Sequence, residues 1–123
     1  MIYSIKKRQN PLNREESKFY ATATFSDIVD LQRIADDISK NCTLTPADIL
    51  AVIQSLVDKL PEYLRFSHKI KLGNFGTFKL SFSAIGQEEE TNVSAKDIKN
   101  LRVLFTPSVD LKHALSKVTF TKK

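Results

Sequence analysis

The stretch His68–Leu80, HKIKLGNFGTFKL, decides the fold. Apolar Ile70 and Leu72 alternate with lysines, and the alternation resumes at Phe78 beyond the turn sequence Gly73–Gly76. Alternation of apolar and polar residues predicts β-strands, and glycine permits a positive φ or a close approach of two backbones. The stretch therefore predicts two strands that are joined by a tight turn.

Two helices are predicted before this stretch. Asp30 is a suitable N-cap, and the residues after it place one apolar stripe at helical spacing: Leu31, Ile34, Ala35 and Ile38. Thr45, Pro46 and Asp48 together mark the start of a second helix. Its apolar face is broader than one core contact needs, so we expect it to pack on a partner chain as well. Pro61 is expected to kink or end this helix and to leave an irregular last turn.

A long hairpin and a third helix are predicted after the turn. The strand is expected to run to Ala84, with a polar hairpin tip at Gly86–Asn92 and a single helical turn at Ser94–Asp97. Alternating apolar residues ending at Phe105 predict the returning strand, and Ser108 is expected to start the last helix.

The first 25 residues predict β-structure. Ile2–Gln9 and Phe19–Phe25 are β-prone runs, and Asn10–Asn13 between them is a turn sequence, so we expect a hairpin or two strands joined by a loop. Five apolar side chains are expected to supply a face that packs on the rest of the protein: Tyr3, Ile5, Phe19, Tyr20 and Phe25.

This order of elements resembles that of the bacterial histone-like HU/IHF proteins, over about residues 27–118. The residues that carry the resemblance are Leu72, Phe75-Gly76-Thr77-Phe78-Lys79, Phe105, and Leu111-Lys112 with Ala114. The first 26 residues lie outside it and resemble the extra N-terminal strands of a bacterial HU-like subgroup. The resemblance implies an α+β, HU/IHF-like fold with a helical pair, a sheet bearing a long hairpin arm, a C-terminal helix and an added N-terminal β-hairpin. We expect a single domain overall, with residues 1–26 as a strand extension packed on the core and residues 27–123 as the HU-like DNA-binding domain.

The resemblance also implies a function. Proteins of this family are intertwined homodimers whose arms enter the minor groove and bend DNA. We therefore expect a non-enzymatic protein that binds double-stranded DNA without sequence preference, and that packages it in the bacterial nucleoid, in the cytoplasm. No cofactor, metal site, membrane contact or small-molecule substrate is expected, and the two histidines have no metal spacing.

Basic side chains are the candidate DNA-binding residues. The resemblance matches Lys79 to a basic strand position after the FGTF motif and Lys112 to a phosphate-facing lysine of the last helix. The other candidates lie on the first strand, on the returning side of the hairpin and at the N-terminus: Lys71, Lys96, Lys99, Arg102, Lys6, Lys7 and Arg8. The alternative for each is an ordinary solvated side chain, and for the N-terminal cluster an edge strand protected by charge.

The predicted arm departs from the family. Residues 80–95 contain no Lys, Arg or Pro, and the tip carries Glu88-Glu89-Glu90, which would repel phosphate. Ile85 is either an apolar wedge or an ordinary hairpin residue. The alternative function is therefore an HU-derived dimeric module for protein interaction or scaffolding, whose acidic arms no longer bind DNA.

The overall charge is consistent with both readings. The net charge is +5, and residues 65–123 carry eleven of the bases against five acids, which fits a polyanion-binding surface or simply aids solubility. The one cysteine, Cys42, cannot form an intrachain disulfide, which fits a reducing cytosol, and we expect it to be a buried structural thiol. No secretory signal and no apolar run long enough to cross a membrane are expected.

Overall fold

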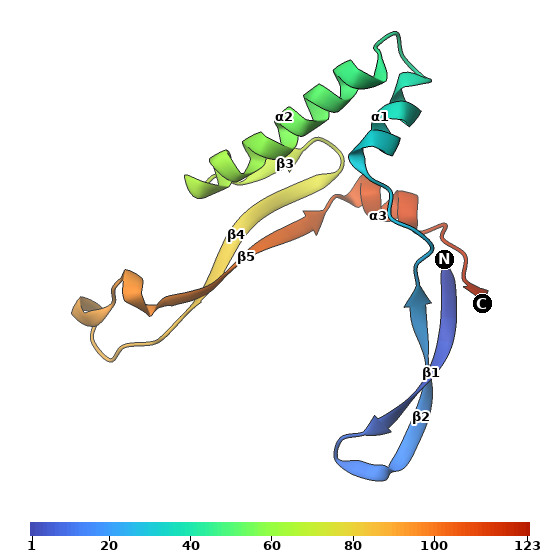
Figure 1. The fold of residues 1–123 in the computed structure, drawn as a ribbon. Helices are drawn as coiled ribbons and strands as arrows, with labels where there is room; N and C mark the ends of the chain where they lie inside the picture. Colours follow the sequence, from blue (N-terminus) through green and yellow to red (C-terminus); the bar gives the residue numbers. More distant parts are fainter. The chain divides into compact units, whose positions relative to one another are not determined.

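The computed structural model describes residues 1–123 as mixed α+β structure, with three α-helices, two short 3-10 helices and two three-stranded sheets. The chain divides into two compact units (Figure 1). The first contains residues 1–29 and 115–123, and the second contains residues 30–114. The α+β class predicted from the sequence is confirmed.

The first unit is a sheet with the strand order β2-β1-β6. β1 (Ile2–Asn10) pairs antiparallel with β2 (Asn13–Thr24), as the strand and turn pattern predicts. The turn between them is held by Asn10, whose Oδ1 accepts a hydrogen bond from the backbone N–H of Leu12 at 3.0 Å. The short β6 (Thr121–Lys122) lies parallel to the start of β1, a pairing that the sequence did not predict.

The register of β1 and β2 corrects one expectation. Tyr3, Ile5 and Phe19 occupy positions that share one face of the hairpin, whereas Tyr20 lies on the opposite face and Phe25 follows the end of β2. The expectation that all five aromatic and aliphatic residues form one apolar face is wrong, because Phe19 and Tyr20 are adjacent and side chains alternate along a strand.

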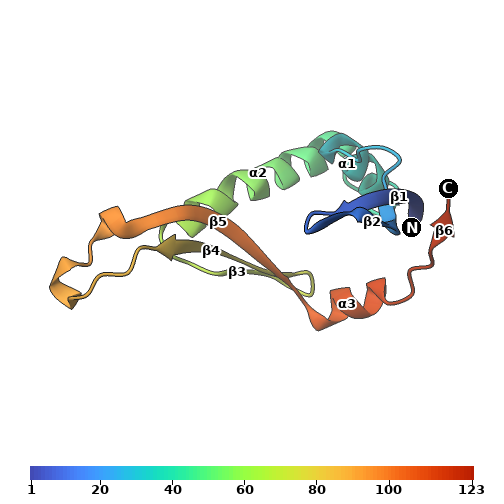
Figure 2. The ribbon, with the colours of Figure 1, turned by 90° about the horizontal axis from the view of Figure 1, so that it is seen from below.

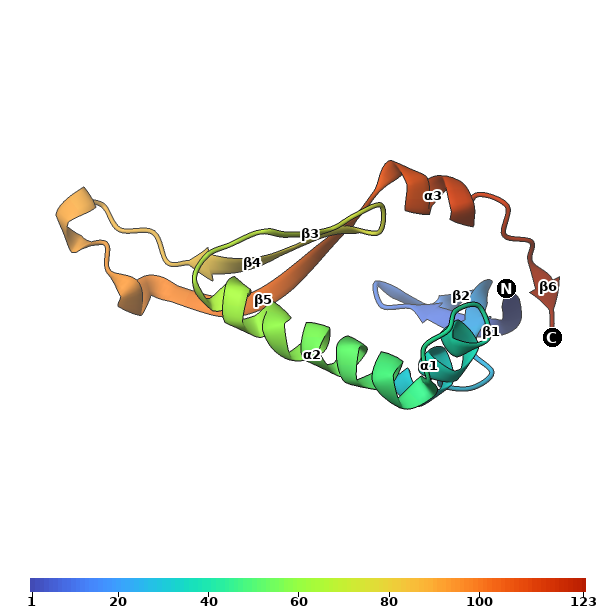
Figure 3. The same ribbon diagram turned by 90° about the horizontal axis from the view of Figure 1, so that it is seen from above.

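Both predicted helix starts of the second unit are confirmed. α1 (Leu31–Ser39) is capped by Asp30, whose Oδ1 accepts from the backbone N–H of Arg33 at 2.9 Å. α2 (Pro46–Arg65) is capped by the Thr45 hydroxyl, which accepts from the N–H of Asp48 at 3.2 Å. α1 and α2 lie against each other (Figure 3).

α2 does not end at Pro61, so the predicted irregular turn after that residue is wrong. A proline inside a helix removes one backbone hydrogen bond and costs about 3 kcal/mol. The helix nevertheless continues to Arg65, and Leu64, in the turn after the proline, is only 8% exposed. Burial of Leu64 offsets part of the cost, a tertiary effect that local sequence does not reveal.

The second sheet has the order β3-β4-β5, and Figure 2 shows β4 and β5 side by side toward the hairpin tip. β3 (Ile70–Leu72), β4 (Gly76–Ala84) and β5 (Ile98–Pro107) are antiparallel, as predicted. Gly73, with φ +49°, begins the turn that joins β3 and β4. A Cβ on Gly76 would lie 2.5 Å from the Phe105 ring and 2.5 Å from the Thr106 carbonyl oxygen, so this position requires glycine.

The third helix, α3 (Val109–Leu115), follows β5. Ser108 starts it, as predicted: its hydroxyl accepts from the N–H of Leu111 at 3.0 Å and donates to the carbonyl of Asn74. The Ser108 N–H also donates to the carbonyl of Phe75 at 3.0 Å. The start of α3 is therefore tied to the turn between β3 and β4.

The chain buries little apolar surface. Its buried apolar residues are Ala35, Ile49 and Leu64. Ile49 and Leu64 are buried on the apolar face of α2, whereas neighbouring positions of the same face are exposed: Val52 (67%), Leu56 (45%) and Tyr63 (54%). The broad apolar face of α2, noted in the sequence, is therefore only partly covered within this chain.

Cys42 lies in the turn after α1 and is exposed, so the expectation of a buried thiol is wrong. Residues between two helices are covered only where another element packs over them, and none does so here. No helix has the length and hydropathy needed to cross a membrane.

Candidate nucleic-acid interface

Three of the predicted DNA-binding residues lie on one face of the second sheet. Lys71 is paired with Thr77 and Arg102 with Ser81, and Lys79 lies between Thr77 and Ser81 on β4. Paired residues share a face, and so do alternate residues of one strand. Lys71, Lys79 and Arg102 therefore share a face.

A β-bulge adds Lys99 to this face. The β4–β5 register shifts between Ser81 and Ser83, so Ser83 pairs with Lys99, three residues before Arg102. The extra residue is accommodated at Asn100, whose φ is +57°. Because Ser83 and Ser81 share a face, Lys99 joins the others. We call Lys71, Lys79, Lys99 and Arg102 the basic sheet face.

The basic sheet face has no neutralising acid. The other positions that share it are Thr77, Ser81, Ser83, Leu104 and Thr106. All four cations are exposed, and none forms an ion pair with a carboxylate. The guanidinium of Arg102 is oriented by donation to the Ser83 hydroxyl at 3.3 Å and to the Asn100 carbonyl at 3.4 Å.

The opposite face of the same sheet is apolar. Phe78 is paired with Phe105 and Leu80 with Val103, and the ring centroids of Phe78 and Phe105 are 4.7 Å apart. The ring centroid of Phe75, in the turn before β4, is 5.1 Å from that of Phe105. The sheet therefore has one apolar and one cationic side.

Two further cations adjoin Lys79. A hollow of about 300 Å³ lies between the end of α2 and β4, and Arg65, Lys69 and Lys79 line it together with His68. Arg65 and Lys69 were not among the predicted DNA-binding residues, because only the folding of the chain at residues 66–69 brings them close to Lys79.

The remaining two predicted residues of this unit lie elsewhere. Lys96 is exposed in the second 3-10 helix, η2 (Ala95–Asp97), beside the hairpin tip. Lys112 is exposed in the last turn of α3. Neither residue is paired with the strands of the basic sheet face.

Asp97 organises the hairpin tip. It is 8% exposed, and its carboxylate accepts from the backbone N–H of Ser94 at 3.0 Å and from the side-chain amide of Gln87 at 2.9 Å. These two donors, Ser94 first, lower the pKa of Asp97 against the opposing effect of burial. The Ile85 N–H donates to the Asp97 carbonyl at 2.9 Å, so the tip closes on itself.

The acids of the tip remain exposed, as expected from the sequence. Glu88 and Glu89 precede the first 3-10 helix, η1 (Glu90–Asn92), and none of these three glutamates forms an ion pair. The single turn predicted at Ser94–Asp97 is confirmed as η2, with reciprocal capping by Ser94 and Asp97. The tip thus presents negative charge on a defined scaffold.

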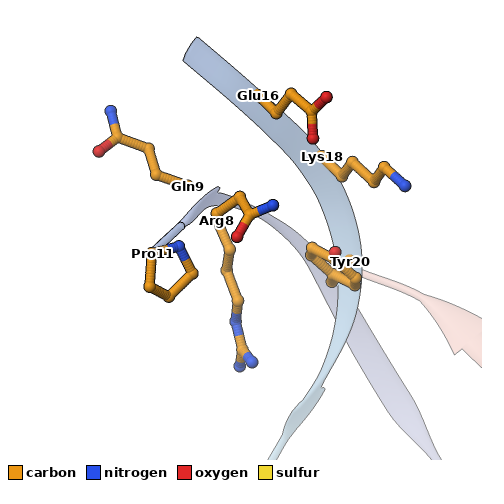
Figure 4. A pocket seen from close by; sticks show the side chains of 7 residues that line it. Arg8, Gln9, Pro11, Glu16, Lys18 and Tyr20 are labelled. Carbon is orange, nitrogen blue, oxygen red and sulfur yellow. The ribbon is translucent and has the colours of Figure 1, made fainter. Parts of the chain in front are cut away.

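The N-terminal cationic cluster is divided between two faces. Lys6 pairs with Tyr20 and Arg8 with Lys18, so these four residues share one face of the first unit, whereas Lys7 pairs with Phe19 on the other. The Arg8 guanidinium lies 6.0 Å from the Tyr20 ring centroid, and the Lys7 ammonium lies 5.8 Å from that of Phe19. Figure 4 shows Arg8, Lys18 and Tyr20 around a hollow at this hairpin.

The chain matches a known protein family over nearly its whole length. A family model described as an HU domain fused to wHTH, Ig, or glycine-rich motif matches residues 1–122. The chain therefore belongs to this HU-HIG family, and the HU-like resemblance predicted from the sequence is confirmed. No curated protein matches the sequence.

Two solved structures are similar in fold. A candidate bacterial DNA-binding protein from Bacteroides vulgatus has a TM-score of 0.62 at 14% identity, over 98% of this chain and 47% of its own. This chain thus corresponds to about half of that protein. HU from Anabaena, in a cocrystal with DNA, has a TM-score of 0.56 at 14% identity, over 73% of this chain and 100% of its own.

Proposed function

We propose that this protein binds double-stranded DNA as a non-enzymatic, sequence-nonspecific homodimer, and that the basic sheet face holds the phosphates. The observation that carries the proposal is the register of β3, β4 and β5, which gathers four unneutralised cations on one side of a sheet. Lysine and arginine contacts to phosphate give affinity and position without reading sequence. Membership of an HU family and likeness to an HU solved with DNA support this reading.

The proposal includes a second copy of the chain. The uncovered part of the apolar face of α2 and the apolar side of the sheet leave large side chains in water, among them Val52 at 67% and Phe75 at 49% exposure. Burial of apolar surface contributes roughly 25 cal/mol for each Å². We infer that a partner copy covers α2 and the phenylalanine cluster.

The acidic tip alters the proposed mode of binding. Because Glu88, Glu89 and Glu90 repel phosphate, DNA contact is moved from these acids to the basic sheet face, and Lys96 in η2 and Lys112 in α3 add charge outside that face. Bending and packaging of the duplex would then follow from wrapping on that surface, with residues 27–123 as the DNA-binding domain. We propose that residues 1–26 are an extension of that domain, with Lys6, Lys7 and Arg8 as supplementary contacts.

An alternative is supported by the same acids. A tip that carries three exposed glutamates on a scaffold fixed by Asp97 is suited to a basic protein partner. In that account the chain is a dimeric interaction module that does not bind DNA.

Titration of the full chain with labelled duplexes of unrelated sequence, at about 50 and 200 mM salt, separates the two accounts. DNA binding predicts similar affinities for every sequence and a steep loss at the higher salt. Absence of binding at the lower salt would favour the interaction module.

A further inference from the structure

The face of the β1–β2 hairpin that carries Lys6, Arg8, Lys18 and Tyr20 has features that duplex binding by the second unit does not use. Arg8 lies directly opposite Lys18 on the neighbouring strand. Like charges in directly opposite positions destabilise a strand pair. An anion placed between them would remove that cost.

The cations are not neutralised within the chain. Lys6, Arg8 and Lys18 are exposed and form no ion pair. Glu16 is the one acid that lines the hollow beside them, and it is not ion-paired with either cation there. Lys6 and Arg8 are separated by about 7 Å along the strand, since each residue advances about 3.4 Å. They are placed to contact successive positions of a polyanion.

An aromatic ring adjoins these charges. Tyr20 is 47% exposed, and its ring lies beside the Arg8 guanidinium, at 6.0 Å from the ring centroid (Figure 4). The hollow next to it measures about 560 Å³, and Gln9 and Asn10 are also among the residues that line it. That size suits a small-molecule-sized group, and an exposed ring beside a cation suits a planar base.

We propose that this hairpin face binds an unpaired nucleotide within single-stranded nucleic acid, with a base stacked on Tyr20 and phosphates held by Arg8, Lys18 and Lys6. A duplex keeps its bases stacked inside the helix. A single strand offers both an unpaired base, which can stack on Tyr20, and phosphates, which the cations can hold. The inference deepens the proposed function, because it gives the first unit its own nucleic-acid partner. A segment of nucleic-acid strand is favoured over a free nucleotide because the row of cations on the hairpin extends beyond the hollow to Lys6.

The opposite face of the hairpin supplies a matched control. There Lys7 and Phe19 form a similar cation–ring pair at 5.8 Å, but Lys7 is the one cation among its neighbours and Ile5 adjoins it. Phe19→Leu therefore changes the same kind of side chain as Tyr20→Leu, at the neighbouring position.

The test is fluorescence anisotropy with a labelled oligothymidylate and, in parallel, a duplex of the same length. We expect Tyr20→Leu to weaken binding of the single strand roughly 5- to 150-fold, the range that corresponds to removal of one base-stacking ring. Arg8→Gln should also weaken it, whereas Tyr20→Phe should retain it and Phe19→Leu on the opposite face should leave it unchanged. Duplex affinity should be the same for Tyr20→Leu as for the unaltered chain.

Each opposing result has a distinct meaning. If Tyr20→Leu and Arg8→Gln bind the single strand as the unaltered chain does, the inference is overturned, while duplex binding and the proposed function stand. If the unaltered chain binds the single strand through Tyr20 but no duplex, the proposed function fails and the inference holds. Displacement of the oligothymidylate by millimolar thymidine monophosphate would overturn the assignment to a nucleic-acid strand. Circular dichroism of each variant shows whether weakened binding results from loss of the fold. Arg8→Gln tests the same binding site independently of Tyr20→Leu.

Discussion

At the scale of single residues, the basic sheet face depends on Asn100. Lys99 and Arg102 are three positions apart, a spacing that places side chains on opposite faces of a regular strand. The bulge at Asn100 inserts the one residue that returns them to the same face. Asparagine tolerates its φ of +57° better than most residues with a side chain.

Asn100→Val should therefore both destabilise the protein and weaken duplex binding. A β-branched residue at positive φ costs at least about 1–2 kcal/mol, and relief of that strain would remove the bulge and turn Lys99 away. Asn100→Gly, which accepts positive φ, is the control and should bind as the unaltered chain does. Thermal melting and duplex anisotropy check both variants, and a valine variant equal to the unaltered chain in both would show that the bulge is not required.

Asp97 has a comparable role in the hairpin tip. Its lowered pKa means that the charged form is favoured in the folded tip. Its contribution is therefore complete above the ordinary pKa of 3.8 and is lost as the pH falls through the lower folded value.

The amide proton of Ser94 should report this titration. In an NMR titration from neutral to acid pH, its resonance should stay constant until the pH falls below 3.8 and then move as the carboxylate is protonated. Asp97→Asn should lose the transition and loosen the tip at every pH, whereas Asp110→Asn on α3 should change neither. A Ser94 resonance that moves with a midpoint above 3.8 would contradict the assigned hydrogen bonds.

At the scale of elements, local signals predicted the starts and turns, and long-range pairing determined the rest. Asp30, Thr45 and Ser108 cap their helices through contacts within three residues, and these were predicted. The β4–β5 bulge and the pairing of β6 with β1 depend on residues distant in sequence, so no local pattern indicated them. For the same reason, the sequence predicted that these lysines and arginines bind DNA, but it did not predict that Lys71, Lys79, Lys99 and Arg102 share one face of the sheet.

The hairpin arm gives a prediction at this scale. Replacing Glu88, Glu89 and Glu90 together with Gln should strengthen duplex binding, because the arm would lose three negative charges that repel phosphate. The gain should shrink at high salt. Asp36 and Asp37 with Glu62, changed to their amides, remove the same charge from the helices and should have a smaller effect. Equal gains in the two variants would mean that only net charge matters and that the arm lies far from DNA.

At the scale of the whole molecule, the chain exposes more apolar surface than a monomer of this kind should. Val52 and Leu56, one turn apart on α2, are 67% and 45% exposed. Scattered exposed apolar residues are common, but neighbouring ones on one helix face form a patch that marks an interface. The same surface explains why the sequence predicted a partner chain for α2 without showing its geometry.

Sedimentation at micromolar concentration should therefore give a dimer. Val52→Asp combined with Leu56→Asp should shift the protein to monomer or unfold it, since a charge buried without a partner is strongly unfavourable. Gln54→Asp, at a polar position of the same helix, should stay dimeric. A stable, folded monomer of the unaltered chain would refute the dimer.

The salt dependence of duplex binding tests the central claim most directly. Each phosphate bound by a cation contributes about 0.9 to the slope of log K against log salt. Changing Lys71, Lys79, Lys99 and Arg102 to Gln should flatten the slope by about 0.9 for each phosphate that the variant no longer binds. Changing Lys40, Lys59, Lys117 and Lys123 to Gln removes the same net charge and should leave the slope nearly intact. If instead both variants keep the slope of the unaltered chain, or both flatten it equally, the basic sheet face is not the surface that binds DNA.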